Sequence, residues 1–305
     1  MLKFSVKILG CSSAMPTTTR MPTAQLISYN TNTYLIDCAE GTQLQLRKMN
    51  CSLLKINNIF ISHLHGDHFY GFFGLISTFN MLGRKNKLNI FAPKELFDIY
   101  KAIQQIKKED LGYDINFIAL NPDGKRKIFD DKYIEVYSFP LKHSIQVWGF
   151  LFSEKEKTLN IKKSAIEEYI LSIKEILKIK KGENYTNEKG EIINNSELTV
   201  PPPPIRNYAY CTDTLPIKSI NKYFQNVDLL YHESTYCSDK KTNAKKHFHS
   251  TAQQAAEIAK ITNAKKLVIG HYSSSYPTTE IFLKEAKEIF ENTVAAYDGL
   301  EIEIL

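Results

Sequence analysis

The sequence predicts a layered α/β protein that holds a metal site, and three observations support this. Strand-like apolar runs alternate with stretches of helical spacing along most of the chain. A histidine-rich motif, "SHLHGDH" at residues 62–68, directly follows one of these runs, and a charged segment at residues 153–204 interrupts the alternation. Hydrophobic residues make up 43% and charged residues 24% of the 305 residues. These ordinary globular values lead us to expect one main domain over residues 1–305.

Each expected element rests on its own pattern of apolar residues. Short β-type runs open the chain, and later strands end in short polar loops that lead into helices. The expected strands are residues 2–9, 24–28, 33–37, 56–62, 132–139, 147–152, 207–212, 227–235 and 266–271. The expected helices are residues 42–49, 69–82 and 255–262, and Phe91 begins a further strand-to-helix unit. This alternation indicates helices packed on sheet.

Charge and cysteine content narrow the function only a little. Lysine and arginine (39) exceed aspartate and glutamate (33), which gives a net charge of +6. Such a mild excess favours polyanionic partners but is common without them. The five cysteines are scattered singly, which suits reduced thiols. Because the N-terminus also has no continuous apolar segment, we expect a cytoplasmic protein.

The segment 153–204, called the arm below, is rich in lysine and glutamate and ends in "PPPP". A helical section is expected at residues 165–183. One interpretation is a solvated surface insertion with a stiff polyproline connector. The other is an arm that contacts a partner through Lys174, Lys178, Lys180 and Lys181. Composition alone leaves both open.

The motif at residues 62–68 predicts a metal site. His63 and His65 are one residue apart, and Asp67 and His68 follow in a turn that we expect to require Gly66. Imidazole and carboxylate donors at this spacing suit two divalent cations, about 3.5–4 Å apart. A polar loop with incidental histidines is the less favoured interpretation.

A two-metal site needs further ligands, and three candidates end other strands. His143, Asp213 and His271 each lie at the carboxyl end of an expected strand, where the loops of a layered sheet gather. Each one alone is more often a turn or cap residue. Together with the first motif, they indicate a second half of the site.

With these residues in view, the chain resembles the metallo-β-lactamase superfamily and, within it, the ribonuclease Z family of tRNA 3′-processing endonucleases. The segments that carry the resemblance run in family order along nearly the whole chain. They are "DCAEGTQLQL" (37–46), "SHLHGDHFYGFFGLI" (62–76), "YHEST" (231–235), "FHSTAQQAA" (248–256) and "VAAYDGLEIEI" (294–304). The resemblance implies a four-layer αββα sandwich with an inserted, protruding arm that binds tRNA.

The resemblance also implies a role for each site residue. One Zn²⁺ would be held by His63, His65 and His143, the other by Asp67, His68 and His271, with Asp213 bridging the two. Asp67 would also accept a proton from the attacking water, and Glu233 with His249 would form a proton-handling pair. The alternatives are a surface carboxylate at Glu233 and an N-cap at His249, although Ser250 and Thr251 suit that capping role better.

The chemistry expected of such a site is metal-assisted hydrolysis. A metal-activated hydroxide attacks phosphorus, and His249 protonates the leaving 3′ oxygen. The products are a tRNA with a 3′-hydroxyl and a trailer with a 5′-phosphate. The implied partners are precursor tRNA and a second copy of the chain in a homodimer.

Three departures from the family pattern concern substrate handling. The arm has no Gly-Pro pair before "LKIKKGENYTNEKGEIINNSEL" (177–198). Ser275 stands where the family often has arginine, a role that Arg206, Lys245 or Lys246 would take over. The loop "MPTTTRMP" (15–22) keeps Arg20 but has Met21 where asparagine is frequent.

Two other functions are compatible with parts of this pattern. One is another hydrolase of the same fold that acts on a small phosphodiester, a sulfate ester or a thioester, which has no use for a charged arm. The other is a catalytically silent RNA-binding protein, which has no need for a complete set of metal ligands.

Overall fold

The computed structural model describes residues 2–107 and 110–305, which form two compact units. The larger unit comprises the chain up to Ser153 and from Arg206 onward, and the smaller unit comprises Glu154–Ile205. Among the described residues, no helix is both long enough and apolar enough to cross a bilayer.

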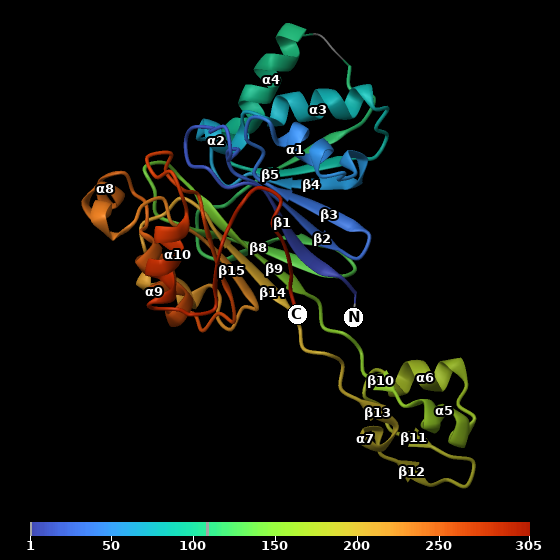
Figure 1. Cartoon of the computed structure of the whole chain (residues 1–305). Helices are drawn as coiled ribbons and strands as arrows, with labels where there is room; N and C mark the ends of the chain where they lie inside the picture. The colour runs from blue at the N-terminus through green and yellow to red at the C-terminus, as the bar shows by residue number, and fades with distance from the viewer. Residues whose placement is uncertain (1, 108–109) are drawn as a thin grey trace. The chain divides into compact units, whose positions relative to one another are not determined.

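The larger unit carries most of the secondary structure (Figure 1). Its strands are β1 (Phe4–Gly10), β2 (Ala24–Tyr29), β3 (Asn32–Ile36), β4 (Ile56–Phe60), β5 (Leu88–Ala92), β6 (Ile115–Ala119), β7 (Arg126–Asp130), β8 (Ile134–Pro140), β9 (Trp148–Glu154), β14 (Asn207–Cys211), β15 (Leu229–Glu233), β16 (Leu267–Gly270), β17 (Thr293–Ala295) and β18 (Glu301–Glu303). Its helices are α1 (Thr42–Lys48), α2 (Gly66–Phe69), α3 (Phe72–Met81), α4 (Glu95–Lys107), α8 (Lys241–Lys246), α9 (Ala252–Ile261) and α10 (Glu280–Lys287). The short 3-10 helices are η1 (Leu53–Lys55), η2 (Lys218–Lys222) and η3 (Ser238–Lys240).

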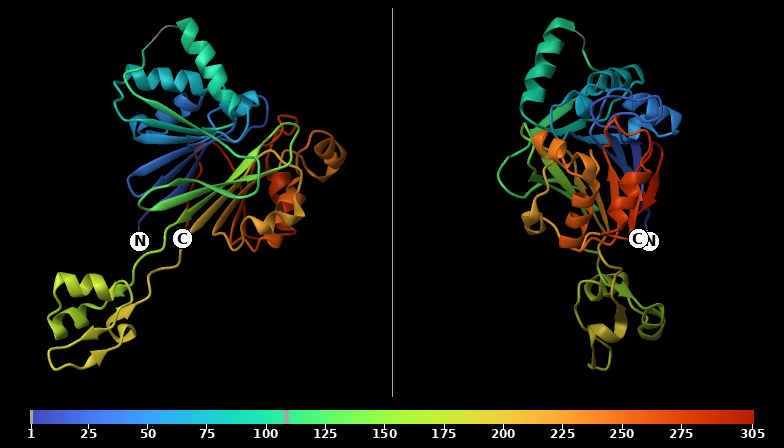
Figure 2. Two further views of the ribbon diagram at one scale, coloured as in Figure 1. Left: turned by 180° about the vertical axis from the view of Figure 1, so that it is seen from behind. Right: turned by 60° about the vertical axis from the view of Figure 1, so that its left-hand side comes forward.

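These strands form two seven-stranded sheets. The first has the order β18-β1-β2-β3-β4-β5-β6 and the second β17-β16-β15-β14-β9-β8-β7. Helices α1, α3 and α4 lie outside the first sheet and α9 and α10 outside the second (Figures 1 and 2). The expected αββα layering is therefore confirmed.

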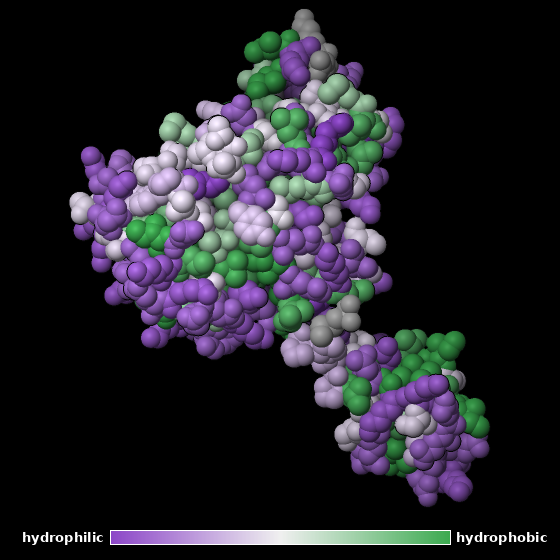
Figure 3. Space-filling view, in the orientation of Figure 1, coloured by the Kyte–Doolittle hydropathy of each residue, from purple (hydrophilic) through white to green (hydrophobic). Residues whose placement is uncertain are grey.

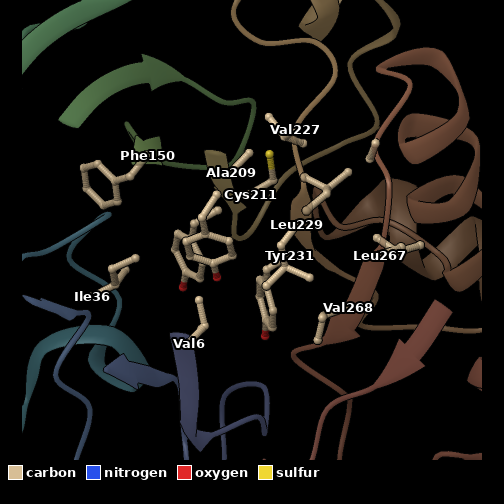
Figure 4. Packing of buried hydrophobic residues seen from close by; sticks show 14 of the residues in the cluster. Val6, Ile36, Phe150, Ala209, Cys211, Val227, Leu229, Tyr231, Leu267 and Val268 are labelled. Carbon is tan, nitrogen blue, oxygen red and sulfur yellow. The ribbon is translucent and has the colours of Figure 1, made fainter. Parts of the chain in front are cut away.

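Successive residues of the first sheet pack into different cores, as the two-residue period of a strand requires. On β4, Ile59 joins the core beneath the helices, whereas Phe60 joins the core between the sheets. Figure 4 shows part of the second of these cores, to which Val6 and Ile36 of the first sheet and Phe150 of the second belong. Burial on both faces explains why residues 59–61, "IFI", are all apolar rather than alternating with polar residues.

Strand direction brings the polar loops of each sheet to one edge. Strands β3, β4 and β5 are parallel neighbours in the first sheet, and β14, β15 and β16 are parallel neighbours in the second. Parallel strands end at the same edge of their sheet, and the loops that follow them gather there. Of the residues expected to form a site, His63, Asp213 and His271 come within three residues of such ends, after β4, β14 and β16.

The smaller unit has its own small core, formed by Ala165, Leu171, Ile179 and Leu198. Its elements are β10 (Asn160–Ile161), α5 (Lys163–Tyr169), α6 (Ile173–Ile179), β11 (Tyr185–Thr186), β12 (Ile192–Ile193), α7 (Asn195–Leu198) and β13 (Thr199–Val200).

The helical section expected at residues 165–183 is divided into two helices. Ile170, between α5 and α6, has left-handed backbone (φ 49) and an 88% exposed side chain. Ser172 then starts α6 with a capping box, in which its hydroxyl and the Glu175 carboxylate bond each other's backbone N–H. The expected section is therefore helical, but it is interrupted at Ile170, where the cap begins a second helix.

Candidate metal centre

Four of the predicted ligands form the first half of the site. His63 and His65 lie in the loop after β4, with Nε2 of the first 3.1 Å from Nδ1 of the second. His143, after β8, brings its Nε2 to 3.2 Å from the same His65 Nδ1. Oδ2 of Asp213 lies 3.6 Å from His63 Nε2 and 3.7 Å from His143 Nε2. The donor atoms of these four residues all lie within 4.8 Å of one another.

The second half consists of Asp67, His68 and His271. Helix α2 carries the first two, and His271 follows β16 with left-handed backbone (φ 62). Asp67 Oδ2 lies 3.6 Å from His68 Nε2 and 3.5 Å from His271 Nε2. The two imidazole Nε2 atoms are 3.3 Å apart. These donor atoms also form a compact group.

Asp213 belongs to both halves through its two different oxygens. Oδ2 faces His63 and His143, whereas Oδ1 lies 3.4 Å from His68 Nε2 and 3.1 Å from His271 Nε2. The residue follows β14 and is 2% exposed. A carboxylate in this position can offer one oxygen to each of two cations.

The donor set fits divalent cations. Ring nitrogens of neighbouring histidines face one another at 3.1–3.3 Å, an arrangement that needs a proton or a cation between the lone pairs. Burial lowers the pKa of His63 to about 4, so its lone pair is free at neutral pH. Imidazole nitrogens with carboxylate oxygens are the ligands that Zn²⁺ prefers at sites that activate water.

The second half attracts positive charge. Burial opposes a charged imidazole, yet the carboxylates of Asp213 and Asp67 raise the pKa of His68 well above its usual value. Burial also opposes a charged carboxylate, but His271 and His68 hold the pKa of Asp213 well below its usual range. The Asp213 carboxylate is therefore ionised, and the raised pKa of His68 shows that the carboxylates here favour a positive charge beside them.

Gly66 has a different role from the one expected. It begins α2 and is not among the glycines with positive φ, so the turn does not require its backbone freedom. A Cβ at this position would lie 2.4 Å from the ring of Tyr70. The constraint on Gly66 is therefore the space that this ring occupies.

Asp37, which follows β3, is a supporting residue to which the sequence assigned no role. Its Oδ1 accepts from the Ser62 backbone N–H at 2.7 Å. Its Oδ2 lies 2.8 Å from His68 Nδ1 and accepts from the hydroxyls of Ser62 (2.9 Å) and Tyr210 (2.7 Å). A proton held on Nδ1 in this way leaves Nε2 as the nitrogen of His68 that can bind a cation in place of its proton. The sequence signals were the position of Asp37 at a strand end and its place in "DCAEGTQLQL", which carries the family resemblance.

Glu233 and His249 lie together, as the resemblance implies. Glu233 ends β15 and is fully buried, and its Oε1 lies 3.0 Å from His249 Nδ1. The same oxygen accepts from the backbone N–H groups of Thr214 and Ser250. The N-cap of α9 is Thr251, as expected, so His249 is free of that role.

Burial and the Glu233 carboxylate act in opposite directions on His249. Desolvation favours the neutral ring, but the adjacent carboxylate outweighs it and raises the pKa of His249 to about 9. Burial likewise raises the pKa of Glu233, and His249 more than reverses this, so its pKa lies below its usual value. The pair is therefore an imidazolium and a carboxylate at neutral pH.

Thr235 connects this pair to the metal ligands, a role that the sequence did not reveal. Its hydroxyl oxygen lies 2.9 Å from Glu233 Oε2 and 2.9 Å from His271 Nδ1. The same oxygen is 3.2 Å from His249 Nδ1. One small side chain thus touches both parts of the site.

The predicted substrate-binding residues are found in different environments. Arg206 is 3% exposed and donates to the backbone carbonyls of Ile304 and Leu2, so its expected phosphate contact is wrong. The ammonium that reaches Ser275 is that of Lys240, at 2.9 Å from the hydroxyl oxygen. It is therefore Lys240, rather than Lys245 or Lys246, that supplies a cation where the family often has arginine.

Arg20 belongs to a loop that touches the site. Its Nη2 donates to the Tyr276 carbonyl at 2.9 Å, and Ala14 of the same loop donates its backbone N–H to Asp67 Oδ2 at 2.7 Å. The remaining predicted contacts, Lys174, Lys178, Lys180 and Lys181, belong to the smaller unit.

Comparison with known proteins adds relatives over the full length of the chain. A family model described as "Anti-Pycsar protein Apyc1" matches residues 4–144. Proteins named Ribonuclease Z from Parabacteroides distasonis and Phocaeicola vulgatus are each 42% identical over 304 residues, which cover the whole chain and 100% and 98% of the relative.

The fold is also similar to solved structures. Human tRNase Z, short form, matches with a TM-score of 0.73 and 26% identity, covering 99% of each chain. The metallo-β-lactamase fold protein YhfI from Bacillus subtilis, at 17% identity and a TM-score of 0.70, matches in fold.

We predict that Asp37→Asn weakens divalent-metal binding by about 10–100-fold, because His68 loses the partner that sets its tautomer. Competition with a chelator of known affinity measures the change. Asp228→Asn is the matched control, since it alters another buried carboxylate, one that accepts from Asn207 N and Lys265. Equal metal affinity in Asp37→Asn and the unmodified protein would contradict the role assigned to Asp37.

Proposed function

The chain belongs to the ribonuclease Z family and is a tRNA 3′-processing endoribonuclease, and we propose that the cluster around Asp213 is its catalytic centre. The observation that carries the function is 42% identity to ribonuclease Z along the whole chain. A small-molecule hydrolase and a silent RNA-binding protein explain neither this full-length match nor the complete donor set.

The proposed metal assignment is two Zn²⁺ per subunit. His63, His65 and His143 would hold one ion, Asp67, His68 and His271 the other, and Asp213 would bridge them. The two compact donor groups, and the separate Asp213 oxygens that face them, support this assignment. Two bound divalent cations supply a water of lowered pKa and balance negative charge on the phosphate.

Asp67 would accept the proton of the attacking water. Its Oδ2 is oriented by the backbone N–H of Ala14. Burial raises the pKa of Asp67, but His68 and His271 lower it far below its usual value, so the carboxylate is ionised and able to accept hydrogen bonds. Arg20 would contact a substrate phosphate, since it is only partly buried and lies close in sequence to Ala14, which contacts Asp67.

His249 would protonate the leaving oxygen. When the bond between phosphorus and the tRNA O3′ breaks, this oxygen takes a proton and becomes a hydroxyl, while the trailer keeps the 5′-phosphate. The Nδ1 of His249 is held by Glu233, so its Nε2 is available to the substrate. Proton donation to a basic alkoxide is typically worth about 10²–10⁴-fold in rate.

The smaller unit, Glu154–Ile205, corresponds to the arm of the sequence analysis. It would bind tRNA through its lysines. Helix α6 exposes Lys174 and Lys178 one turn apart, and Lys181 follows its end. The acidic residue within α6, Glu175, bonds back to Ser172, so its charge is already used at the cap. Exposed lysines suit the phosphates of RNA.

We also propose a homodimer in which the smaller unit of one subunit presents tRNA to the catalytic centre of the other. The family resemblance supports this arrangement. Such a dimer requires that one chain can supply tRNA binding and the other chain catalysis. This requirement is testable without a structure of the dimer.

Cleavage of one precursor tRNA with mapping of both product ends tests the function directly. We expect a cut just after the discriminator nucleotide, a 3′-hydroxyl on the tRNA and a 5′-phosphate on the trailer. His65→Ala should abolish this cleavage while RNA binding stays within about 3-fold, because the histidine belongs to the metal set and not to the RNA-binding surface. Substantial cleavage by His65→Ala would show that the assigned centre is wrong.

The role of His249 is tested by changing the leaving group. We predict that His249→Ala lowers cleavage of an ordinary substrate by about 10²–10⁴-fold. A substrate whose 3′ bridging oxygen is replaced by sulfur should restore much of this loss, because a thiolate leaves without protonation. Loss of the same size on both substrates would contradict the general-acid role.

The variant Glu233→Gln should move the alkaline limb of the pH profile of precursor cleavage to lower pH, because the carboxylate that raises the pKa of His249 is gone.

Removal of the smaller unit tests the tRNA contact. Ser153 and Asn207 are paired across β9 and β14, so a short Gly-Ser linker can replace residues 154–205. We expect this deletion to lose precursor cleavage but to retain hydrolysis of bis(p-nitrophenyl) phosphate. Undiminished precursor cleavage would contradict the proposed contact.

Mixing the deleted chain with His65→Ala chains then tests the dimer. Each variant alone should be inactive on precursor tRNA, and activity should return in mixed dimers, where one chain supplies the smaller unit and the other the catalytic centre. No recovery despite proven mixing of subunits would indicate that the smaller unit serves its own chain.

A further inference from the structure

An open pocket of about 510 Å³ lies beside His249, the proposed general acid. None of the roles proposed above involves this pocket. Its lining includes Lys142, Leu215, Pro216, Lys241, Lys245 and His249. His249 therefore belongs both to the catalytic centre and to the wall of this pocket. Any group that occupies the pocket is next to the atom that would donate the proton.

The walls of the pocket are fixed to the loops that carry metal ligands. The Leu215 backbone N–H donates to the Lys142 carbonyl at 2.8 Å, and the Lys142 N–H donates to the Thr214 hydroxyl oxygen at 3.0 Å. Lys142 immediately precedes His143, and Thr214 immediately follows Asp213. The pocket is thus positioned by the same backbone that positions the catalytic centre.

The chemistry of the lining suits a nucleotide. Three lysines supply positive charge for phosphate, and Leu215 with Pro216 offers apolar surface to the face of a base. Lys241 and Lys245 belong to α8, over which the molecular surface is largely hydrophilic (Figure 3). The pocket combines the two contacts that nucleic-acid sites most often combine.

A second pocket near the histidine motif differs in charge. It has a volume of about 230 Å³ and is lined by Leu64, Pro93, Glu95, Ile145 and Gln146. Its one charged lining residue is an acid, which disfavours a phosphate. Of these two spaces, the lysine-lined pocket is therefore the better match to RNA.

We propose that the lysine-lined pocket binds the last nucleotide of the mature tRNA, the one whose O3′ leaves. This inference rests on the proposed function, in which His249 protonates that oxygen. A nucleoside whose O3′ is at His249 has its own base and 5′-phosphate on the same side of the scissile bond. The pocket that shares His249 is the space available to that nucleoside.

The contribution of the pocket lysines to tRNA binding is tested by removing lysines inside the pocket and, as a control, lysines outside it. We expect the double variant Lys241→Ala/Lys245→Ala to raise KM for precursor tRNA by about 10-fold, with kcat within about 2-fold of the unmodified enzyme. The slope of log kcat/KM against log salt should become shallower by about 1 to 2. The control double variant Lys246→Ala/Lys260→Ala removes two exposed lysines that do not line the pocket. Equal effects of the two double variants would overturn the proposal.

Abasic substrates identify the nucleotide. With the unmodified enzyme, an abasic site at the last tRNA nucleotide should raise KM by about 5-fold or more, whereas an abasic first trailer nucleotide should not. Leu215→Ala should reduce this sensitivity. A larger effect from the trailer position would overturn the assignment. If the unmodified enzyme fails to cleave precursor tRNA at all, it is the proposed function that is wrong, so the two failures are distinguishable.

Discussion

One buried carboxylate joins the two halves of the catalytic centre. Asp213 turns a different oxygen to each group of histidines, and nearly all of its surface is hidden from solvent. A buried carboxylate without partners is costly, and here its partners are four imidazole rings. The rest of the larger unit holds these side chains in position.

The positions of these side chains depend on contacts between the two sheets. The histidine motif comes from the first sheet and Asp213 from the second, so the site is complete only where both sheets end together. Asp37, after β3, accepts from the Tyr210 hydroxyl of β14, and the Trp148 N–H of β9 donates to the Ser62 carbonyl. The core between the sheets and these two polar contacts thus set the distance between the ligands that the first sheet supplies and those that the second sheet supplies.

The parts of the site that could be predicted from sequence are those with a local signal. The spacing of His63 and His65 is visible in seven residues, and His143 and His271 stand directly after apolar runs that read as strands. Asp37 and Thr235 also end expected strands, but the sequence indicated no role for either, because their contacts arise only when distant loops meet. Sequence position was misleading for Arg206, which the fold uses to bind two backbone carbonyls. The break at Ile170 was also missed, because helical spacing continues across it.

Two donor groups that share Asp213 would hold two divalent ions in each chain. Elemental analysis of protein purified without chelators, set against an accurate protein concentration, measures this metal content. We expect about two ions per chain in the unmodified protein. We expect about one ion or fewer in Asp213→Asn, because both ions lose their shared ligand. Less than one ion per chain in the unmodified protein would show that this two-metal assignment is wrong.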